Sequence, residues 1–256
     1  MRCNENTIIV DKDVVLVPYR PEHVAKYHEW MTSAELRELT ASEPLTLEEE
    51  YEMQQKWQTD EDTDSAWPTN NDPDLPLHAS PIRKHPELTF IILARPRDAD
   101  DPSAPSTLTH ADGDDNLDIH SLPMVGDVNL FLKGTPEDED FEAEAEVMIA
   151  EPAFRRRGLA LAALELMLSY ATSPSAPAPL PVPRERLVAR IAETNEPSVR
   201  LFERLGFAVT RRVEVFQELE MRWGAKEGAH VERWREGVTR TLQLRNFTSV
   251  REMLTP

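Results

Sequence analysis

The chain has 256 residues, of which 40% are hydrophobic, and a formal net charge of -19. Its pI is near 4.8 and its mean hydropathy is -0.51. A negative field of this kind repels phosphate backbones and anionic membrane faces, so we expect neither nucleic acid nor a membrane as a partner. Cys3 is the only cysteine, which excludes an intramolecular disulfide and a thiolate metal site.

The first residues carry no signal-peptide pattern, because the apolar run at the N-terminus is broken by Asp11, Lys12 and Asp13. No stretch approaches the roughly 20 apolar residues that a membrane span needs. We therefore expect a soluble cytoplasmic protein, with a nuclear location also open.

The N-terminal region, up to about residue 57, has the patterns of ordered structure. The run 14–17 is apolar and β-branched, which predicts a strand. Residues 21–31 carry apolar side chains at helical spacing. A second helix is predicted over 45–57, because Thr46 and Glu49 stand at the spacing of a capping box.

The middle region is acidic and rich in proline. Segments at about 58–86 and 95–122 lack any period and have too few apolar residues to offset the entropy cost of ordering. Between them, Leu88 to Ala94 (LTFIILA) is typical of a buried strand. We interpret the two segments as surface insertions on either side of a core strand.

The region from 124 to 223 is denser in apolar residues and alternates between strand and helix patterns. These patterns predict strands over 124–132 and 141–149, a helix over 157–172, a strand over 186–192, a helix over 196–205, and strands within 207–223 that break near Phe216. The order favours an α+β fold on a mixed sheet. We expect one domain over 1–225 and a C-terminal extension over 226–256, which could add a helix.

The turn between the strand ending at Ala150 and the following helix is a candidate anion site. The first N–H groups of a helix have no intrahelical acceptor, and Gly158 and Ala160 keep side-chain bulk away from them. Three consecutive arginines, residues 155–157, add positive charge there. A solvated arginine flank with a tolerated turn glycine is the alternative. Neither a Walker A loop nor a G-x-G-x-x-G pattern is present.

A second constellation opens the next helix, at Asn195 and Ser198. Ligands bind near such strand ends, but ordinary helix capping also explains both residues.

Together these blocks resemble a known family. RRRGLA (Arg155 to Ala160) is similar to the [Q/R]-x-x-G-x-[G/A] pyrophosphate loop of the GCN5-related N-acetyltransferase (GNAT) superfamily, and NEPSVRLFERLGF (Asn195 to Phe207) resembles its companion block. The phrases VVLVPY, HVAKYHEWM, ELTASEPLTLEEEY, MVGDVNLFL and EVMIAEP resemble the N-acetyltransferase 9-like branch of that superfamily. The acidic insertions and the tail fall outside the resemblance.

The resemblance implies a GNAT-type fold, which is a mostly antiparallel twisted sheet flanked by helices, with one splayed pair of parallel strands. Acetyl-CoA would lie between the strands that end near Ala150 and Ala192, its pantetheine on strand backbone and its pyrophosphate on the turn. The residues implied to hold it are Val147, Met148, Ile149, Arg155, Arg156, Arg157, Gly158, Leu159, Ala160, Asn195, Ser198 and Phe202.

The implied reaction is transfer of acetyl from acetyl-CoA to an amine, of a protein or peptide, by direct attack in a ternary complex. Glu144 and Glu146 share one strand face and are candidate general bases, with Glu193 as a third, although a solvated strand face also explains the first two. Phe202 stands where many family members carry a tyrosine as general acid.

That departure keeps two alternatives open. One is a catalytically weak or inactive interaction protein with a cytoskeletal or other basic partner, and the other is a small-molecule amine acetyltransferase. On the acceptor side, Tyr27, His28 and Trp30 could stack on a peptide, but aromatic residues at helical spacing more often belong to the core. No residues have metal-ligand spacing, so we expect no metal. The oligomeric state is left open.

Overall fold

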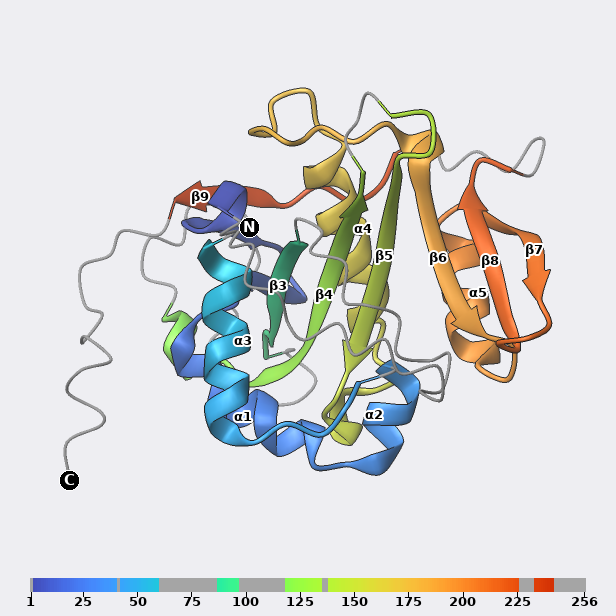
Figure 1. The fold of residues 1–256 in the computed structure, drawn as a ribbon. Helices are drawn as coiled ribbons and strands as arrows, with labels where there is room; N and C mark the ends of the chain where they lie inside the picture. The colour runs from blue at the N-terminus through green and yellow to red at the C-terminus, as the bar shows by residue number, and fades with distance from the viewer. Residues whose placement is uncertain are drawn as a thin grey trace.

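The computed structural model describes residues 2–40, 42–59, 87–96, 118–134, 138–225 and 233–241. The predicted insertions fall largely outside these ranges. The described residues form one sheet in the order β7-β8-β6-β5-β4-β3-β2-β1-β9 (Figure 1). Its strands are β1 (Thr7–Val10), β2 (Val14–Pro18), β3 (Glu87–Ala94), β4 (Met124–Lys133), β5 (Glu142–Ile149), β6 (Leu187–Ala192), β7 (Phe207–Val213), β8 (Glu218–Trp223) and β9 (Val238–Thr241).

Five α-helices accompany the sheet in the described ranges. They are α1 (Pro21–Met31), α2 (Ala34–Thr40), α3 (Leu47–Thr59), α4 (Leu159–Ala171) and α5 (Glu196–Arg204). Short 3-10 turns cover Arg2–Asn4, Ile119–Ser121, Pro152–Phe154 and Arg184–Arg186. The predicted capping box of α3 is present, since the Glu49 N–H donates to Thr46 Oγ1 and the Thr46 N–H donates to the Glu49 carboxylate.

The helices cover both faces of the sheet (Figure 1). Helix α4 packs behind it, burying Leu164, Met167 and Leu168 against apolar residues such as Leu130 and Phe90. Helices α1 to α3 lie on the opposite face, where Val24, Trp30 and Met31 join a second, smaller core. Two apolar layers around one sheet explain why β2 and β3 carry apolar residues on both faces.

One pair of neighbouring strands, β5 and β6, runs parallel, and the other neighbours are antiparallel. The β5–β6 register covers only Ala143 with Leu187 and Glu144 with Val188. Beyond these pairs β5 stays bonded to β4, and β6 to β8. The predicted mixed sheet with a splayed parallel pair is therefore confirmed.

Three elements differ from the sequence prediction. Strand β1 and helix α2 were not expected, and a helix in the tail is wrong for Val238–Thr241, which form β9 and pair with β1. Trp234 is buried in the main core and donates from Nε1 to the carbonyl of Leu205. Within the tail, residues 233–241 thus pack against the sheet and its core, while the division at residue 225 stays a prediction. No helix in the described part of the chain is long and apolar enough to cross a membrane.

Candidate active site

The gap between β5 and β6 leaves strand backbone available on one side of β5. A Cβ on Gly126 of β4 would lie 1.9 Å from the Met148 carbonyl oxygen, so that carbonyl faces β4. Backbone groups of successive strand residues point in opposite directions, and those of Val147 and Ile149 therefore face the gap. Of the three residues expected to contact pantetheine through their backbone, the geometry favours these two.

The turn after β5 presents open N–H donors, as expected. Arg156 and Gly158 both have positive φ, 60° and 82°, and Gly158 precedes α4 with no side-chain cap. The helix begins at Leu159, two residues later than predicted, because the left-handed Gly158 interrupts it. The N–H groups of Leu159 and Ala160 lie in the first turn, where no intrahelical acceptor exists, and they form an uncapped, positive helix end.

Arg155 makes contacts within the protein that its sequence position did not indicate. Its Nε donates to the Ile149 carbonyl at 3.0 Å, a second guanidinium nitrogen lies 3.4 Å from the Ala150 carbonyl, and a third pairs with Glu35 of α2 at 3.3 Å. Arg157 stacks over the ring of Phe154 at 5.1 Å. Arg155 therefore fixes the turn, and the pyrophosphate contact predicted for its side chain stays a prediction.

A cavity of about 270 Å³ lies between α1, α2 and this turn. Its lining includes Lys26, Trp30, Leu36, Ala150, Glu151 and Arg155. The charged groups around it are paired, Lys26 with Glu151 at 2.8 Å and Arg155 with Glu35, and Trp30 Nε1 also donates to Glu151 at 2.8 Å. These contacts hold the first helices against the turn.

The downstream block is built around capping and packing. Asn195 Oδ1 accepts from the Ser198 backbone N–H at 3.2 Å, so the capping explanation applies to the Asn195 side chain. Phe202 is 3% exposed and packs edge-to-face on Phe207, with ring centroids 5.1 Å apart. A phenyl ring in the core cannot supply a proton, and cofactor contacts by these three residues stay predictions.

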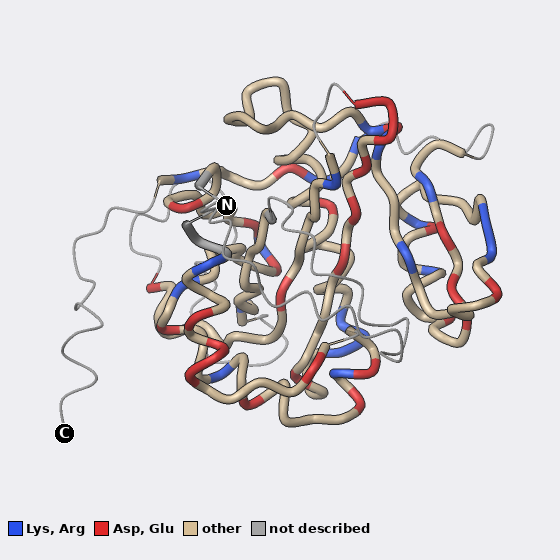
Figure 2. Tube along the Cα trace, in the orientation of Figure 1, with Lys and Arg blue, Asp and Glu red and all other residues tan. Residues whose placement is uncertain are grey.

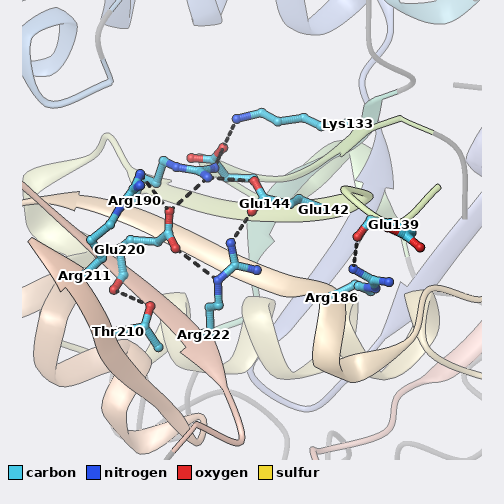
Figure 3. Close-up of polar contacts among 10 residues, drawn as sticks. All are labelled: Lys133, Glu139, Glu142, Glu144, Arg186, Arg190, Thr210, Arg211, Glu220 and Arg222. Atoms are coloured by element: carbon cyan, nitrogen blue, oxygen red, sulfur yellow. Dashed lines mark hydrogen bonds and ion pairs between the residues drawn. The ribbon is translucent and has the colours of Figure 1, made fainter. Parts of the chain in front are cut away.

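Glu144 belongs to an ion-pair network that joins four strands (Figure 3). Its carboxylate contacts Lys133 of β4 and Arg190 of β6, the latter at 2.7 Å. Arg190 also pairs with Glu142 at 2.7 Å and with Glu220 of β8 at 3.2 Å, and Arg222 contacts the same two glutamates. Figure 2 shows acidic segments along β5 and a basic one on β6, whereas β8 carries residues of both signs. The network ties β5 to β6 next to the point where they part.

Glu146 lies two residues beyond Glu144 along β5, past the last β5–β6 pair, and its environment is different. It is half-buried, and no described residue makes a hydrogen bond or ion pair with its carboxylate. Burial raises the pKa of Glu146 to about 8, and the negative charges of Glu144 and Asp127 act in the same direction. A carboxylate with this pKa can accept a proton near neutral pH.

The other residues considered from the sequence are engaged elsewhere. Glu193 pairs with Arg212 at 2.7 Å on the surface of β7. Tyr27 and Trp30 are 8% and 5% exposed, which confirms the core interpretation of these aromatics. His28 lies with its Nδ1 3.9 Å from Glu50. Among the described residues, no group of three or more His, Cys, Asp or Glu is placed to hold a metal.

Two polar residues beside Glu146 were missed from the sequence. Asp127 and Asn129 of β4 lie on the same sheet face as Glu146, and Asn129 is its direct partner in register. Their alternation with Val128 and Leu130 in MVGDVNLFL was the available signal. A strand pattern alone does not say which β5 residue each would face.

Comparison with known proteins places this geometry in context. The family model described as an acetyltransferase (GNAT) domain matches residues 13–208. The human alpha/beta-tubulin-N-acetyltransferase 9 is 39% identical over 231 residues, covering 90% of this chain and 89% of that protein. The Drosophila melanogaster protein of the same name is 40% identical over 221 residues, covering 86% and 88%.

Solved structures share the fold at low sequence identity. Spermidine N-acetyltransferase from Vibrio cholerae, in complex with CoA and spermine, has a TM-score of 0.54 and 15% identity, covering 82% of this chain and 95% of that one. A GNAT-family acetyltransferase from Bordetella pertussis has a TM-score of 0.51 and 19% identity, covering 85% and 99%.

Proposed function

This chain belongs to the GNAT acetyltransferase family and is an acetyl-CoA-dependent N-acetyltransferase, and from that premise and the names of its relatives we propose that its acceptor is an amine of a protein. We propose further that the acceptor amine attacks acetyl-CoA directly, with both bound, and that Glu146 is the general base. A cytoplasmic location remains part of this proposal.

The observation that carries the proposal is the open edge of β5 next to an uncapped helix end. The backbone groups of Val147 that face the gap have no strand partner once the β5–β6 register ends at Glu144. They suit the amides of pantetheine. The N–H groups of Leu159 and Ala160 suit a pyrophosphate. The strand edge and the helix end therefore offer hydrogen-bonding groups of the kinds that pantetheine and a pyrophosphate need.

Acetyl-CoA supplies the thioester, and the protein has to deliver a neutral amine to it. An ammonium has no lone pair, so a proton must leave the acceptor nitrogen first, and Glu146 is the free carboxylate beside the gap. The N–C bond then forms as the C–S bond breaks. The nitrogen gives up its second proton as CoA leaves as a thiolate, and a water molecule would carry that proton to the sulfur, since Phe202 cannot donate one.

Glu144 suits the base role less well than Glu146 does. Both Lys133 and Arg190 contact its carboxylate, and its side chain is 7% exposed. A carboxylate that two cations already contact is less available to an incoming amine. We assign Glu144 to the network that holds β5 against β6.

We take the acceptor class from the relatives. The human, mouse and Drosophila melanogaster proteins bear the name alpha/beta-tubulin-N-acetyltransferase 9. We propose that this chain likewise acetylates an amine of tubulin. The formal net charge of the chain, -19, gives no general attraction to an acidic protein surface, so a local contact has to select the amine.

Two measurements test the proposal. Acetyl-CoA well above its Kd should raise the melting temperature, because a ligand that binds only the folded state stabilises it. Purified αβ-tubulin with acetyl-CoA should then gain acetyl groups and release CoA thiol, and Glu146→Gln should lower that rate by about 10²-fold or more. Glu203→Gln, an exposed site on α5, is the matched control. Thermal stabilisation without any acetylated tubulin would refute the acceptor but not cofactor binding.

A further inference from the structure

A row of polar side chains crosses three strands at Glu146. Thr89 of β3 pairs with Asn129 of β4, and Asn129 pairs with Glu146 of β5, so the three lie side by side on the face covered by α1 to α3. Asp127 lies on the same face, two residues before Asn129. The nearby residues Ile91 and Met148 are apolar and buried, so this polar row stands out on its face of the sheet.

The orientation of Asn129 follows from its contact with Asp127. The Asn129 Nδ2 donates to Asp127 Oδ2 at 2.8 Å. A carboxylate can only accept hydrogen bonds, so the amide nitrogen must face Asp127 and the amide oxygen must face away from it. Tyr27 also lies close to Asp127 Oδ2, with its hydroxyl at 3.4 Å. Asp127 thereby fixes the carboxamide that stands next to Glu146.

Three side-chain oxygens of the row receive no hydrogen bond from the described residues. Asn129 Oδ1, Asp127 Oδ1 and Thr89 Oγ1 are buried and have no hydrogen-bond partner in the described part of the chain. Asp127 is 2% exposed and Thr89 is 7% exposed. Leaving such groups without partners is costly, and native structures rarely do so. These oxygens therefore call for a ligand that donates.

The charged groups near the row are mostly negative. Burial raises the pKa of Asp127 to about 6, against the opposing hydrogen bonds from Asn129 and Tyr27, so the group is ionised above that pH. Lys133 is the cation that acts on Glu146, and its ammonium is bonded to Glu144. A ligand with several donors and one positive charge would satisfy both deficits.

We propose that Asn129 and Glu146 receive the ammonium group of the acceptor, with Asp127 as the positioning residue that orients Asn129 and supplies the countercharge. The inference rests on the proposed function, since it concerns the amine that is acetylated. The site selects amines that are cationic in water. Asn129 Oδ1 holds the ammonium while one N–H proton passes to the Glu146 carboxylate, which leaves a neutral amine and a protonated Glu146.

Asp127→Asn tests the positioning role, because it removes the charge while it keeps the shape. We expect the KM for tubulin to rise about tenfold or more, as for loss of a charge-assisted contact, with the Kd of acetyl-CoA within about twofold of wild type. The charged groups that act on Glu146 are Glu144, Asp127, Lys133 and Glu218. Loss of the Asp127 charge should therefore shift the rising limb of the pH–rate profile to lower pH. A merely structural role would not move that limb. Asp140→Asn, at an exposed site, is the control.

A binding measurement keeps the inference testable if the variant folds poorly. Wild-type protein with desulfo-CoA, which lacks the reactive thiol, should bind native tubulin at least about tenfold more tightly than tubulin whose amines were acetylated chemically. Equal affinities would overturn the ammonium site.

The outcomes separate the two proposals. Preference for native tubulin without any acetylation refutes the acceptor reaction and supports the ammonium site. Normal acetylation by Asp127→Asn, with unchanged KM and pH limb, overturns the ammonium site and leaves the proposed function standing.

Discussion

Replacing Arg190 by leucine should lower the free energy of unfolding. It should also loosen the contact between β5 and β6 beside the gap that we propose for acetyl-CoA. Arg190 contacts Glu142, Glu144 and Glu220, whose side chains are 18%, 7% and 8% exposed. Removing one partner of a fully buried ion pair costs about 3–5 kcal/mol. Arg190 is itself 23% exposed, and Lys133 and Arg222 would still contact these glutamates. We therefore expect a loss of about 2 kcal/mol, or about 4–8 °C in Tm for a chain of this size.

The pH dependence identifies the cause of that loss. Burial opposes ionisation of Glu142, but hydrogen bonds from Arg190 and Arg222 outweigh it and lower its pKa. A group with a lowered folded pKa stabilises the protein above its unfolded pKa, and that contribution is lost as the pH falls through the folded value. The difference between wild type and Arg190→Leu should therefore shrink as the pH falls below the ordinary glutamate pKa, about 4.3.

Thermal denaturation across this pH range, with acetyl-CoA titration at pH 7, measures both effects. Arg200→Leu is the matched control, because Arg200 and Glu196 form an exposed pair on α5, with side chains 68% and 73% exposed. Such pairs contribute at most about 1 kcal/mol. Equal losses in the two variants, or a loss for Arg190→Leu that does not change with pH, would refute the network as the cause.

Three further substitutions test local geometry. Gly126→Ala would place a Cβ 1.9 Å from the Met148 carbonyl oxygen, so β4 and β5 must separate, and urea unfolding should show a loss of about 1–3 kcal/mol. Gly158→Ala meets no atom within 4 Å, so only its φ of 82° is unfavourable; the same assay should show about 1 kcal/mol. Phe202→Tyr buries a hydroxyl in the core at a cost of about 1–3 kcal/mol, and kcat should not rise; a tenfold rise would show that position 202 faces the leaving thiolate.

Most of the sheet could be predicted from the sequence because its strands are local apolar runs. Leu88 to Ala94 and the alternation from Phe141 to Ile149 needed no distant partner to be identified. Strand β9 could not be identified without its distant partner. Its sequence VTRT is weakly apolar and becomes a strand only through pairing with β1, more than 200 residues earlier. Its sequence pattern therefore carried no comparable signal.

The site was predictable where a backbone pattern defines it and not where side chains from different strands meet. The uncapped start of α4 follows from Gly158 and the first-turn rule. The phosphate contact of Arg155 stays a prediction, and its contacts with the carbonyls of Ile149 and Ala150 had no sequence signal, because only the folded turn brings them within reach. Glu144 and Glu146 are equivalent candidate bases in the sequence pattern. The structure distinguishes them, because Arg190, 46 residues away, donates to Glu144.

The pH dependence of kcat/KM tests the central claim most directly, namely that Glu146 deprotonates the acceptor amine. Burial raises the pKa of Glu146 to about 8 in the free protein, and a base must be ionised to act, so wild-type kcat/KM for tubulin acetylation should rise with pH and level off above that value. Glu146→Gln should lower kcat/KM by about 10²-fold or more and abolish the rise. A Glu146→Gln variant that keeps both the rate and the pH dependence of the wild type would contradict the account.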